Sequence, residues 1–162
     1  MGLMDTLLGS SKGLEAGAKA PEFTLNDQDG NPVSLGSFRG QKNVVVYFYP
    51  KDDTPGCTKE SCAFRDQFTA FTDVGAEVLG ISSDSEASHK KFKEKHRLPF
   101  RLLADKGGNT RKAFGVPATL GLLPGRVTYV VDKQGTIRHA FNSQINATQH
   151  VAEALNVLKT LV

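Results

Sequence analysis

A run of six apolar residues, Val44–Tyr49, is the feature that most constrains how this chain folds. The run contains three valines followed by tyrosine, phenylalanine and tyrosine, so that half of it is β-branched and half aromatic. A run of this length and composition is typical of a β-strand that is buried on both faces. It therefore predicts an α/β fold in which this strand lies inside a sheet covered by helices.

A helix start follows this strand after a short polar loop. Thr54 supplies a hydroxyl N-cap and Pro55 suits the first helical position, while three phenylalanines recur at helical spacing over residues 64–71. Cys57 then lies in the first turn of the helix, at the carboxyl end of the strand. Free backbone N–H groups and the positive end of the helix dipole meet there and favour the thiolate, the reactive form of cysteine. The spacing therefore predicts a reactive-cysteine site.

Strand and helix patterns alternate along the rest of the chain. Strands are predicted at residues 23–25 and 33–35 as a hairpin, at 77–82, at 102–104, and at 127–131 and 136–141 as a second hairpin. Helices are predicted from Asp84 or Ser85 to about residue 96, over 109–114, and from about residue 148, while 115–125 is predicted to be a long loop. This order is that of a thioredoxin-like α/β sandwich.

The length and charge of the chain limit its organisation and its partners. A chain of 162 residues with 39% hydrophobic content makes one domain, which we assign to residues 17–162, with 1–16 as a flexible tail. The net charge of +3 comes from 20 basic and 17 acidic residues that are interspersed, so no nucleic-acid partner is expected. No membrane partner is expected, because no apolar run is long enough to span a bilayer.

The residues around Cys57 resemble a known family. Pro50, Thr54 and Cys57 match the Pro-x-x-x-Thr/Ser-x-x-Cys motif of peroxiredoxins, and Cys62, five residues further on, is similar to the second cysteine of the bacterioferritin comigratory protein or peroxiredoxin Q subfamily. The likeness continues through Leu98-Pro99-Phe100 and Leu123-Pro124-Gly125-Arg126 and covers roughly residues 17 to 160. It implies a thioredoxin-like fold with a central mixed β-sheet flanked by helices, and a thiol-dependent peroxidase.

The resemblance also implies a role for each site residue. Cys57 attacks hydrogen peroxide or an organic hydroperoxide and becomes a sulfenic acid, and Cys62 resolves it as an intramolecular disulfide that thioredoxin or a similar dithiol reduces. Thr54 offers a hydroxyl to a peroxide oxygen, Pro50 helps to exclude water, and Arg126 favours the thiolate and charge on the departing oxygen. No metal, haem or flavin cofactor is implied.

Each of these residues also has a purely structural interpretation. Cys57 could be a small buried hydrophobe, and Cys62 could form a permanent disulfide worth only about 2 kcal/mol, because the loop it closes is short. Thr54 could serve only as an N-cap, Pro50 could only end a strand, and Arg126 could be a surface charge.

Other charged residues are expected at the surface. Asp52 and Asp53 would oppose ionisation of the cysteine if they pointed inward, so we expect both to be solvated. The four histidines have no metal-ligand spacing to one another or to the cysteines, and we expect all four at the surface: His89, His96, His139 and His150.

Two other functions compete with a peroxidase. The first is a thioredoxin-like thiol–disulfide exchange protein, since Val116–Thr119 superficially resembles the proline loop of thioredoxins; that class, however, carries Cys-x-x-Cys, whereas four residues separate the cysteines here. The second is a binding domain without enzymatic activity.

With no secretory signal and two cysteines, the chain fits the cytoplasm of a bacterial-type cell, or a plastid if a transit peptide has been removed. An intramolecular resolving cysteine suits a monomer.

The spacing of the cysteines makes a conformational prediction. On a regular helix, the Cα atoms of residues five apart are about 8.6 Å from each other, and a disulfide tolerates at most about 7 Å. A bridge between Cys57 and Cys62 therefore requires the helix to unwind locally. The polar run over residues 58–61 predicts weak apolar anchoring of this segment and a low cost of opening.

Overall fold

The computed structural model describes residues 14–116, 118–119, 123–143 and 146–161. Most of the predicted tail, residues 1–13, lies outside the described residues. Of the tail's last residues, Leu14 donates its backbone N–H to the Phe114 carbonyl at 3.0 Å.

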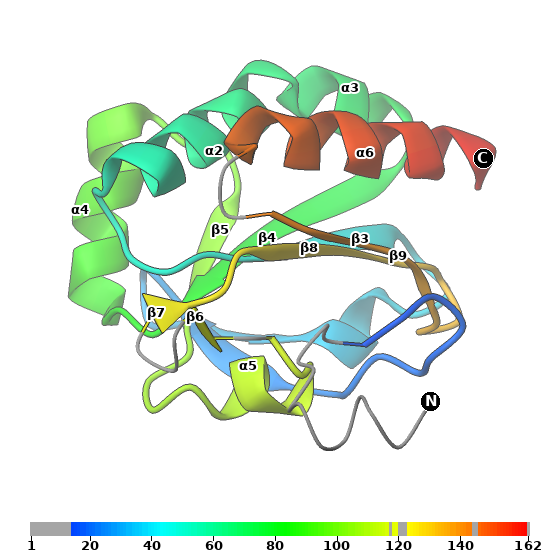
Figure 1. Cartoon of the computed structure of the whole chain (residues 1–162), viewed down its shortest axis with the longest axis horizontal. Coiled ribbons are helices and arrows are strands. Elements are labelled where there is room, and N and C mark those ends of the chain that lie inside the picture. The colour runs from blue at the N-terminus through cyan, green and yellow to red at the C-terminus, as the bar shows by residue number, and fades with distance from the viewer. Residues whose placement is uncertain (1–13, 117, 120–122, 144–145, 162) are drawn as a thin grey trace.

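A seven-stranded mixed sheet forms the centre of the molecule (Figure 1), in the order β2-β1-β5-β4-β3-β8-β9. Its strands are β1 (Thr24–Asp27), β2 (Pro32–Ser34), β3 (Asn43–Phe48), β4 (Ala76–Ser82), β5 (Arg101–Ala104), β8 (Val127–Val131) and β9 (Ile137–Asn142). β3 runs parallel to β4, and β4 parallel to β5, whereas β8 and β1 join this parallel core antiparallel. The strand β3 lies between β4 and β8, and its residues are buried, which confirms the prediction from Val44–Tyr49.

Helices cover both faces of the sheet. They are η1 (Leu35–Phe38, a 3-10 helix), α2 (Pro55–Asp66), α3 (Phe68–Asp73), α4 (Glu86–His96), α5 (Asn109–Ala113) and α6 (Ala147–Thr160). In Figure 1, α2, α3 and α6 lie above the sheet and α5 lies below it. The architecture is the thioredoxin-like α/β fold that the sequence predicts.

Side chains on the two faces of β3 pack into two different hydrophobic clusters. Val46 and Phe48 pack with Phe114 on the α5 side, whereas Tyr47 packs with Phe64 on the α2 side, their ring centroids 4.6 Å apart. All six residues of the strand are buried. Burial on both faces fixes the end of β3, and hence the start of the loop that precedes Cys57.

Two local expectations differ from the structure. The helical pattern over residues 64–71 belongs to two helices, because α2 ends at Asp66 and α3 begins at Phe68, with Gln67 between them at φ −103° and ψ 10°. The segment predicted as a loop over 115–125 contains two short antiparallel strands, β6 (Ala118–Thr119) and β7 (Leu123–Pro124). Strands of two residues leave no readable alternation in a sequence.

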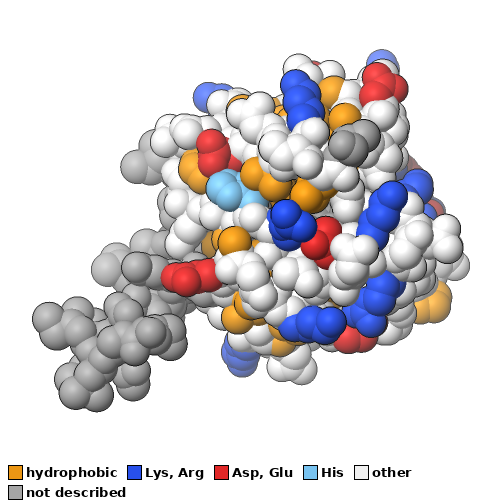
Figure 2. Space-filling model, turned by 90° about the vertical axis from the view of Figure 1, so that its right-hand side faces the viewer, with side chains coloured by type: hydrophobic (Ala, Val, Ile, Leu, Met, Phe, Trp, Pro, Cys, Tyr) orange, Lys and Arg blue, Asp and Glu red, His pale blue; other side chains and the backbone are white. Residues whose placement is uncertain are grey.

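The surface carries mixed charge. Figure 2 shows Lys and Arg side chains spread over one face, with acidic and hydrophobic side chains between them. Among the described residues, no helix combines the length and the apolar character needed to cross a membrane.

Candidate active site

Cys57 is the third residue of α2, after Thr54 as N-cap and Pro55 at the first helical position. This is the placement predicted from the sequence. The cysteine side chain is completely buried. The N-cap differs in detail: Thr54 makes no side-chain cap, and its hydroxyl instead donates to the Lys51 carbonyl at 2.9 Å. The Thr54 hydroxyl therefore donates within its own loop, and Cys57 lies in the first turn of α2, where the backbone N–H groups have no partner within the helix.

Arg126 holds its guanidinium against the sulfur of Cys57. Its Nη2 donates to Cys57 Sγ at 3.4 Å, and its Nη1 donates to Glu60 Oε1 at 2.7 Å. The residue is only 4% exposed, so the interpretation of Arg126 as a surface charge is wrong. Burial lowers the pKa of Arg126, but Glu60 and Cys57 more than offset this and leave its pKa above the ordinary value. A permanent positive charge at this distance favours the thiolate form of Cys57.

Glycine at position 56 makes room for this contact. A Cβ atom on Gly56 would lie 2.9 Å from Arg126 Nη2 and 3.7 Å from its Cζ. Gly56 directly precedes Cys57 in the first turn of α2. The guanidinium therefore lies close against the start of the helix, where a side chain at position 56 would displace it.

The contact of Arg126 continues into the core through Glu60 and His150. We call these three residues the arginine cluster. Both Glu60 and His150 are fully buried, and Glu60 Oε2 lies 3.4 Å from His150 Nδ1. Burial raises the pKa of Glu60 to about 8, although Arg126 pulls it down. Burial also lowers the pKa of His150 to about 4. The expectation of a surface position for His150 is wrong, because this face of α6 packs on the sheet.

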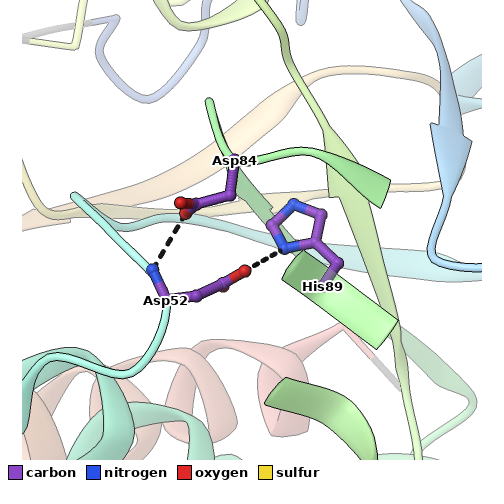
Figure 3. A group of neighbouring side chains, drawn as sticks. All are labelled: Asp52, Asp84 and His89. Carbon is purple, nitrogen blue, oxygen red and sulfur yellow. Dashed lines mark hydrogen bonds and ion pairs between the residues drawn. The ribbon is translucent and has the colours of Figure 1, made fainter. Parts of the chain in front are cut away.

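The aspartate cluster, consisting of Asp52, Asp84 and His89, lies beside the loop that precedes Cys57 (Figure 3). Asp52 Oδ2 accepts from Ser88 at 2.9 Å and contacts His89 Nδ1 at 2.7 Å, while Asp52 Oδ1 accepts from Tyr49 at 2.5 Å. The backbone N–H of Asp52 donates to Asp84 Oδ2 at 2.9 Å. These contacts tie the loop to the start of α4.

Both sequence expectations about this cluster are wrong. Asp52 is 6% exposed and His89 is completely buried, although we expected them at the surface. Both side chains can be buried because each provides a hydrogen-bond partner for the other. The His89 ring contacts Asp52 through Nδ1 at 2.7 Å and the Leu103 carbonyl through Nε2 at 2.9 Å. Asp53 is exposed as expected and pairs with Lys95 at 3.0 Å.

The remaining histidines, His96 and His139, are partly exposed. Their side chains retain 19% and 31% of their accessible surface, and His139 Nε2 lies 2.9 Å from Glu153 Oε1.

The aspartate cluster has the residue types of a metal site, since one ligand atom from each residue lies within 4.8 Å of the others. Each of these atoms, however, already has a hydrogen-bond partner: Asp52 Oδ2 has Ser88, His89 Nδ1 has Asp52, and Asp84 Oδ2 has Ser82 at 2.5 Å. A set of donors and acceptors satisfied in this way acts as an internal network.

The second cysteine lies further along the same helix. Cys62 is half-buried, and both it and Cys57 are free thiols. Glu60 and Ser61, between them, are completely buried, and the Ser61 hydroxyl bonds Tyr47 Oη at 2.9 Å. The polar run over 58–61 is thus held by polar partners at Glu60 and Ser61 instead of by apolar packing, so opening this segment has to break buried polar contacts.

Pro50 is half-buried and follows β3 after one residue, in the same loop as Asp52 and Thr54.

The sequence analysis does not single out Glu60, although the sequence contains a signal for it. Glu60 lies three residues after Cys57 and four before Phe64, which places all three on one face of α2. A polar residue on the face that carries Cys57 and Phe64 indicates a buried partner.

Comparison with known proteins gives a consistent result. The sequence matches the AhpC/TSA family over residues 16–140. It is 56% identical over 146 residues to "Peroxiredoxin Q, chloroplastic" of Oryza sativa subsp. japonica, covering 90% of this chain and 67% of the rice protein. It is 55% identical to the protein of that name from Sedum lineare, covering 90% of this chain and 78% of that protein.

Solved structures show the same likeness. Peroxidoxin BcpB of Mycobacterium tuberculosis superposes with a TM-score of 0.85 at 36% identity, covering 92% of this chain and 99% of that one. A Xanthomonas campestris peroxiredoxin Q superposes with a TM-score of 0.78 at 31% identity, covering 85% and 90%.

Proposed function

Because this chain belongs to the AhpC/TSA family and is a peroxiredoxin of the peroxiredoxin Q type, a thiol peroxidase, we propose that Cys57 is its peroxide-reducing nucleophile. The observation that carries the proposal is the contact between Cys57 Sγ and Arg126 Nη2, 3.4 Å apart, at the buried start of α2. A fixed cation and free helix N–H groups beside one sulfur favour the thiolate that attacks peroxides.

The first step transfers one oxygen atom. The Cys57 thiolate attacks one peroxide oxygen, the O–O bond breaks, and the departing oxygen takes a proton to leave as water or an alcohol. Cys57 is left as a sulfenic acid, oxidised by two electrons. Arg126 stabilises the negative charge that develops on the departing oxygen. The Thr54 hydroxyl, whose proton goes to the Lys51 carbonyl, orients the peroxide by accepting a hydrogen bond from its O–H, and Pro50 keeps water away from the sulfur.

The second step closes a disulfide. The Cys62 thiol displaces water from the Cys57 sulfenic acid, and an external dithiol of the thioredoxin type then reduces the Cys57–Cys62 bridge to two thiols. Both cysteines lie within α2, so their Cα atoms are about 8.6 Å apart in a regular helix, beyond the roughly 7 Å that a disulfide tolerates. The helix must therefore open between the two steps, which frees the buried Glu60 and Ser61.

Two cysteine variants test the assignment. Cys57→Ser should abolish peroxide consumption, because a serine hydroxyl is almost wholly un-ionised at neutral pH. Cys62→Ser should keep the first turnover but fail to cycle with thioredoxin unless a small thiol resolves the sulfenic acid. Equal loss of the first turnover in both variants would contradict the division of roles. An insulin-reduction assay on the same proteins distinguishes a peroxidase from a disulfide exchanger.

Amide exchange tests the opening of α2. The oxidised protein should exchange faster than the reduced protein over residues 57–64 and show less helix by circular dichroism. The short helix α5 (Asn109–Ala113), which lies on the other face of the sheet, serves as an internal reference, since the proposed opening of α2 leaves it in place. Identical exchange over 57–64 in both states would mean that the bridge forms between chains.

The proposal extends to assembly and location. A bridge within one chain needs no second subunit, so we expect a monomer, which sedimentation of the reduced protein checks. The relatives named as chloroplastic favour the plastid over the cytoplasm. Fractionation of the source cells, probed with an antibody to this protein, decides between the two compartments.

A further inference from the structure

The two oxygens of Glu60 lie in unequal surroundings. Oε1 accepts a hydrogen bond from Arg126 Nη1 at 2.7 Å. Oε2 has no hydrogen-bond partner among the residues that the structure describes, and it is completely buried. The ring atom His150 Nδ1 lies 3.4 Å from it. One side of this carboxyl group therefore faces a cation and the other faces an imidazole.

The hydrogen bonds of His150 determine what its Nδ1 can offer. Nε2 lies 2.8 Å from the Ser143 carbonyl, which can only accept, so Nε2 carries the ring proton. In the neutral ring, Nδ1 is then an acceptor, and the Thr128 hydroxyl approaches it at 2.8 Å. Burial together with the charge of Arg126 lowers the pKa of His150 to about 4, which keeps the ring neutral at physiological pH.

An ionised Glu60 does not fit this arrangement. A carboxylate oxygen that is buried without a donor is strongly destabilised by the loss of its hydration, and a neutral imidazole presents only a lone pair to it. A protonated Oε2 instead places an O–H beside the Nδ1 lone pair, for which it competes with the Thr128 hydroxyl, while Oε1 continues to accept from Arg126. The His150 side therefore favours the protonated carboxyl, whereas the Arg126 side favours the carboxylate, and burial outweighs the effect of Arg126.

We propose that Glu60 is a positioning residue that carries a proton on Oε2, facing His150, in the reduced enzyme. In this state Glu60 holds the Arg126 guanidinium in place without neutralising its charge. The positive charge then acts on Cys57 Sγ, 3.4 Å from Arg126 Nη2. Ionisation of Glu60 would pair the two charges and weaken the stabilisation of the thiolate. This inference rests on the proposed role of Cys57 only for its effect on rate.

The groups around Glu60 agree with this assignment. Arg126 faces it from the segment before β8, His150 from α6, Tyr47 from β3, and Cys57 from its own helix. Of these, only Arg126 is cationic, and burial nevertheless raises the pKa of Glu60 to about 8. Burial, followed by smaller contributions from neighbours that include Glu60, raises the pKa of Tyr47 well above its ordinary value, so the phenol is neutral as well.

The protonation state is measured directly in the reduced protein. With 13C-labelled glutamate, the side-chain carboxyl resonance of Glu60 is assigned through bonds and checked by its loss in Glu60→Gln. We expect the resonance of a protonated acid at neutral pH, titrating above pH 7, where the exposed glutamates have already ionised. A Glu60 carboxyl that is fully ionised at pH 6 would overturn the proposal. This measurement does not depend on Cys57 being the nucleophile.

A neighbouring variant sharpens the result. Thr128→Val keeps the shape of the side chain but removes the hydroxyl that competes for His150 Nδ1. The Glu60 titration should then move to higher pH, because the acceptor becomes free for its proton. A move to lower pH, or none, would show that His150 does not hold that proton and would overturn its part in the proposal.

Kinetics supply the functional test. In single turnovers with hydrogen peroxide, the wild-type rate should fall by roughly tenfold as Glu60 ionises, less than the 10²–10³-fold typical of removing a charge-stabilising donor outright. Glu60→Gln cannot ionise, so its rate should lack this alkaline decline. If the decline persists in Glu60→Gln, it has another source and the effect on Arg126 is rejected. If Cys57→Ser still reduces peroxide, the proposed function fails while the carboxyl measurement stands.

Discussion

Two buried ionic clusters meet the segment around Cys57, and they differ in how completely their hydrogen bonds are satisfied. In the aspartate cluster, both carboxylate oxygens of Asp52 and both ring nitrogens of His89 have partners. In the arginine cluster, Glu60 Oε2 and Arg126 Nε have none among the described residues. A fully satisfied network rigidifies a structure, whereas buried polar atoms without partners are typical of groups with a catalytic role or stored strain.

The clusters are also attached to different parts of the fold. The aspartate cluster joins the loop over residues 50–54 to α4. The arginine cluster joins α2 to the start of β8 and to α6. In the proposed mechanism, disulfide formation within α2 disturbs the second connection but not the first. The loop that carries Pro50 and Thr54 would then stay anchored while the helix after it opens.

Loss of the Asp52 carboxylate should have the largest effect on stability. Asp52→Ala leaves Tyr49 and His89 without their buried partner, and breaking a buried pair in this way costs about 3–5 kcal/mol of unfolding free energy. Asp52→Asn should lose less, because an amide oxygen still accepts from Tyr49. Urea unfolding at pH 7 measures the loss of unfolding free energy in both variants.

Asp53→Asn is the matched control. Its exposed partner Lys95 contributes little to stability, and Asn tolerates the positive φ of 61° at this position. Equal midpoints for Asp52→Ala and Asp53→Asn would contradict an anchoring role.

Loss of the Arg126 guanidinium should act on rate instead. Arg126→Ala removes the cation beside Cys57 Sγ, and single-turnover peroxide consumption should slow by roughly 10²–10³-fold, the loss typical of a missing charge-stabilising donor. Arg126→Lys should recover only part of this, since one ammonium group cannot contact both Cys57 and Glu60 as the guanidinium does. Arg138, whose side chain is 50% exposed and pairs with Asp132, is the control for charge alone. Arg138→Ala should leave the single-turnover rate unchanged. A loss of rate as large as that of Arg126→Ala would mean that the overall positive charge of the protein, and not the contact with Cys57, determines the rate.

The arginine cluster should also make stability depend on pH. The pKa of His150 falls from 6.5 to about 4 on folding, mainly through burial. Between these values the unfolded chain binds more protons than the folded one, so this histidine lowers stability as the pH falls from about 6.5 to 4. A shift of this size corresponds to about 3 kcal/mol.

Urea unfolding of wild type and His150→Gln over this pH range isolates the contribution. Glu60 contributes with the opposite sign, since its pKa is raised by burial, but it does so in both proteins. The wild type should lose stability relative to His150→Gln on acidification. Parallel curves for the two proteins would mean that His150 is not buried in the neutral form.

The contrast between the clusters explains how far the sequence alone leads. The buried strand, the helix start at Thr54 and the place of Cys57 follow from local patterns, because periodicity and capping are local. The partners of Cys57 do not: Arg126 lies 69 positions away, and its contact was expected only from a resemblance. Asp52 and His89 were misassigned to the surface because a polar residue is read as exposed unless its partner, here 37 positions away, is known.

The smallest expected effect comes from Gly56→Ala, which separates helix stability from the position of Arg126. Alanine within a helix is favoured over glycine by roughly 0.5–1 kcal/mol, so α2 gains intrinsic stability. The new Cβ, however, would lie 2.9 Å from Arg126 Nη2. Because Glu60 holds the other arm of the guanidinium at 2.7 Å, the group must turn away from Cys57 to make room.

Gly56→Ala should therefore unfold no more easily than wild type, yet reduce peroxide more slowly, by less than the roughly 10²–10³-fold expected when the cation is removed. Lys59→Ala is the control: it changes an exposed residue of the same helix without approaching the arginine. A rate for Gly56→Ala equal to that of Lys59→Ala would show that the contact between Arg126 and Cys57 tolerates displacement. The charge of Arg126, and not its position, would then be what the arginine cluster supplies to the sulfur.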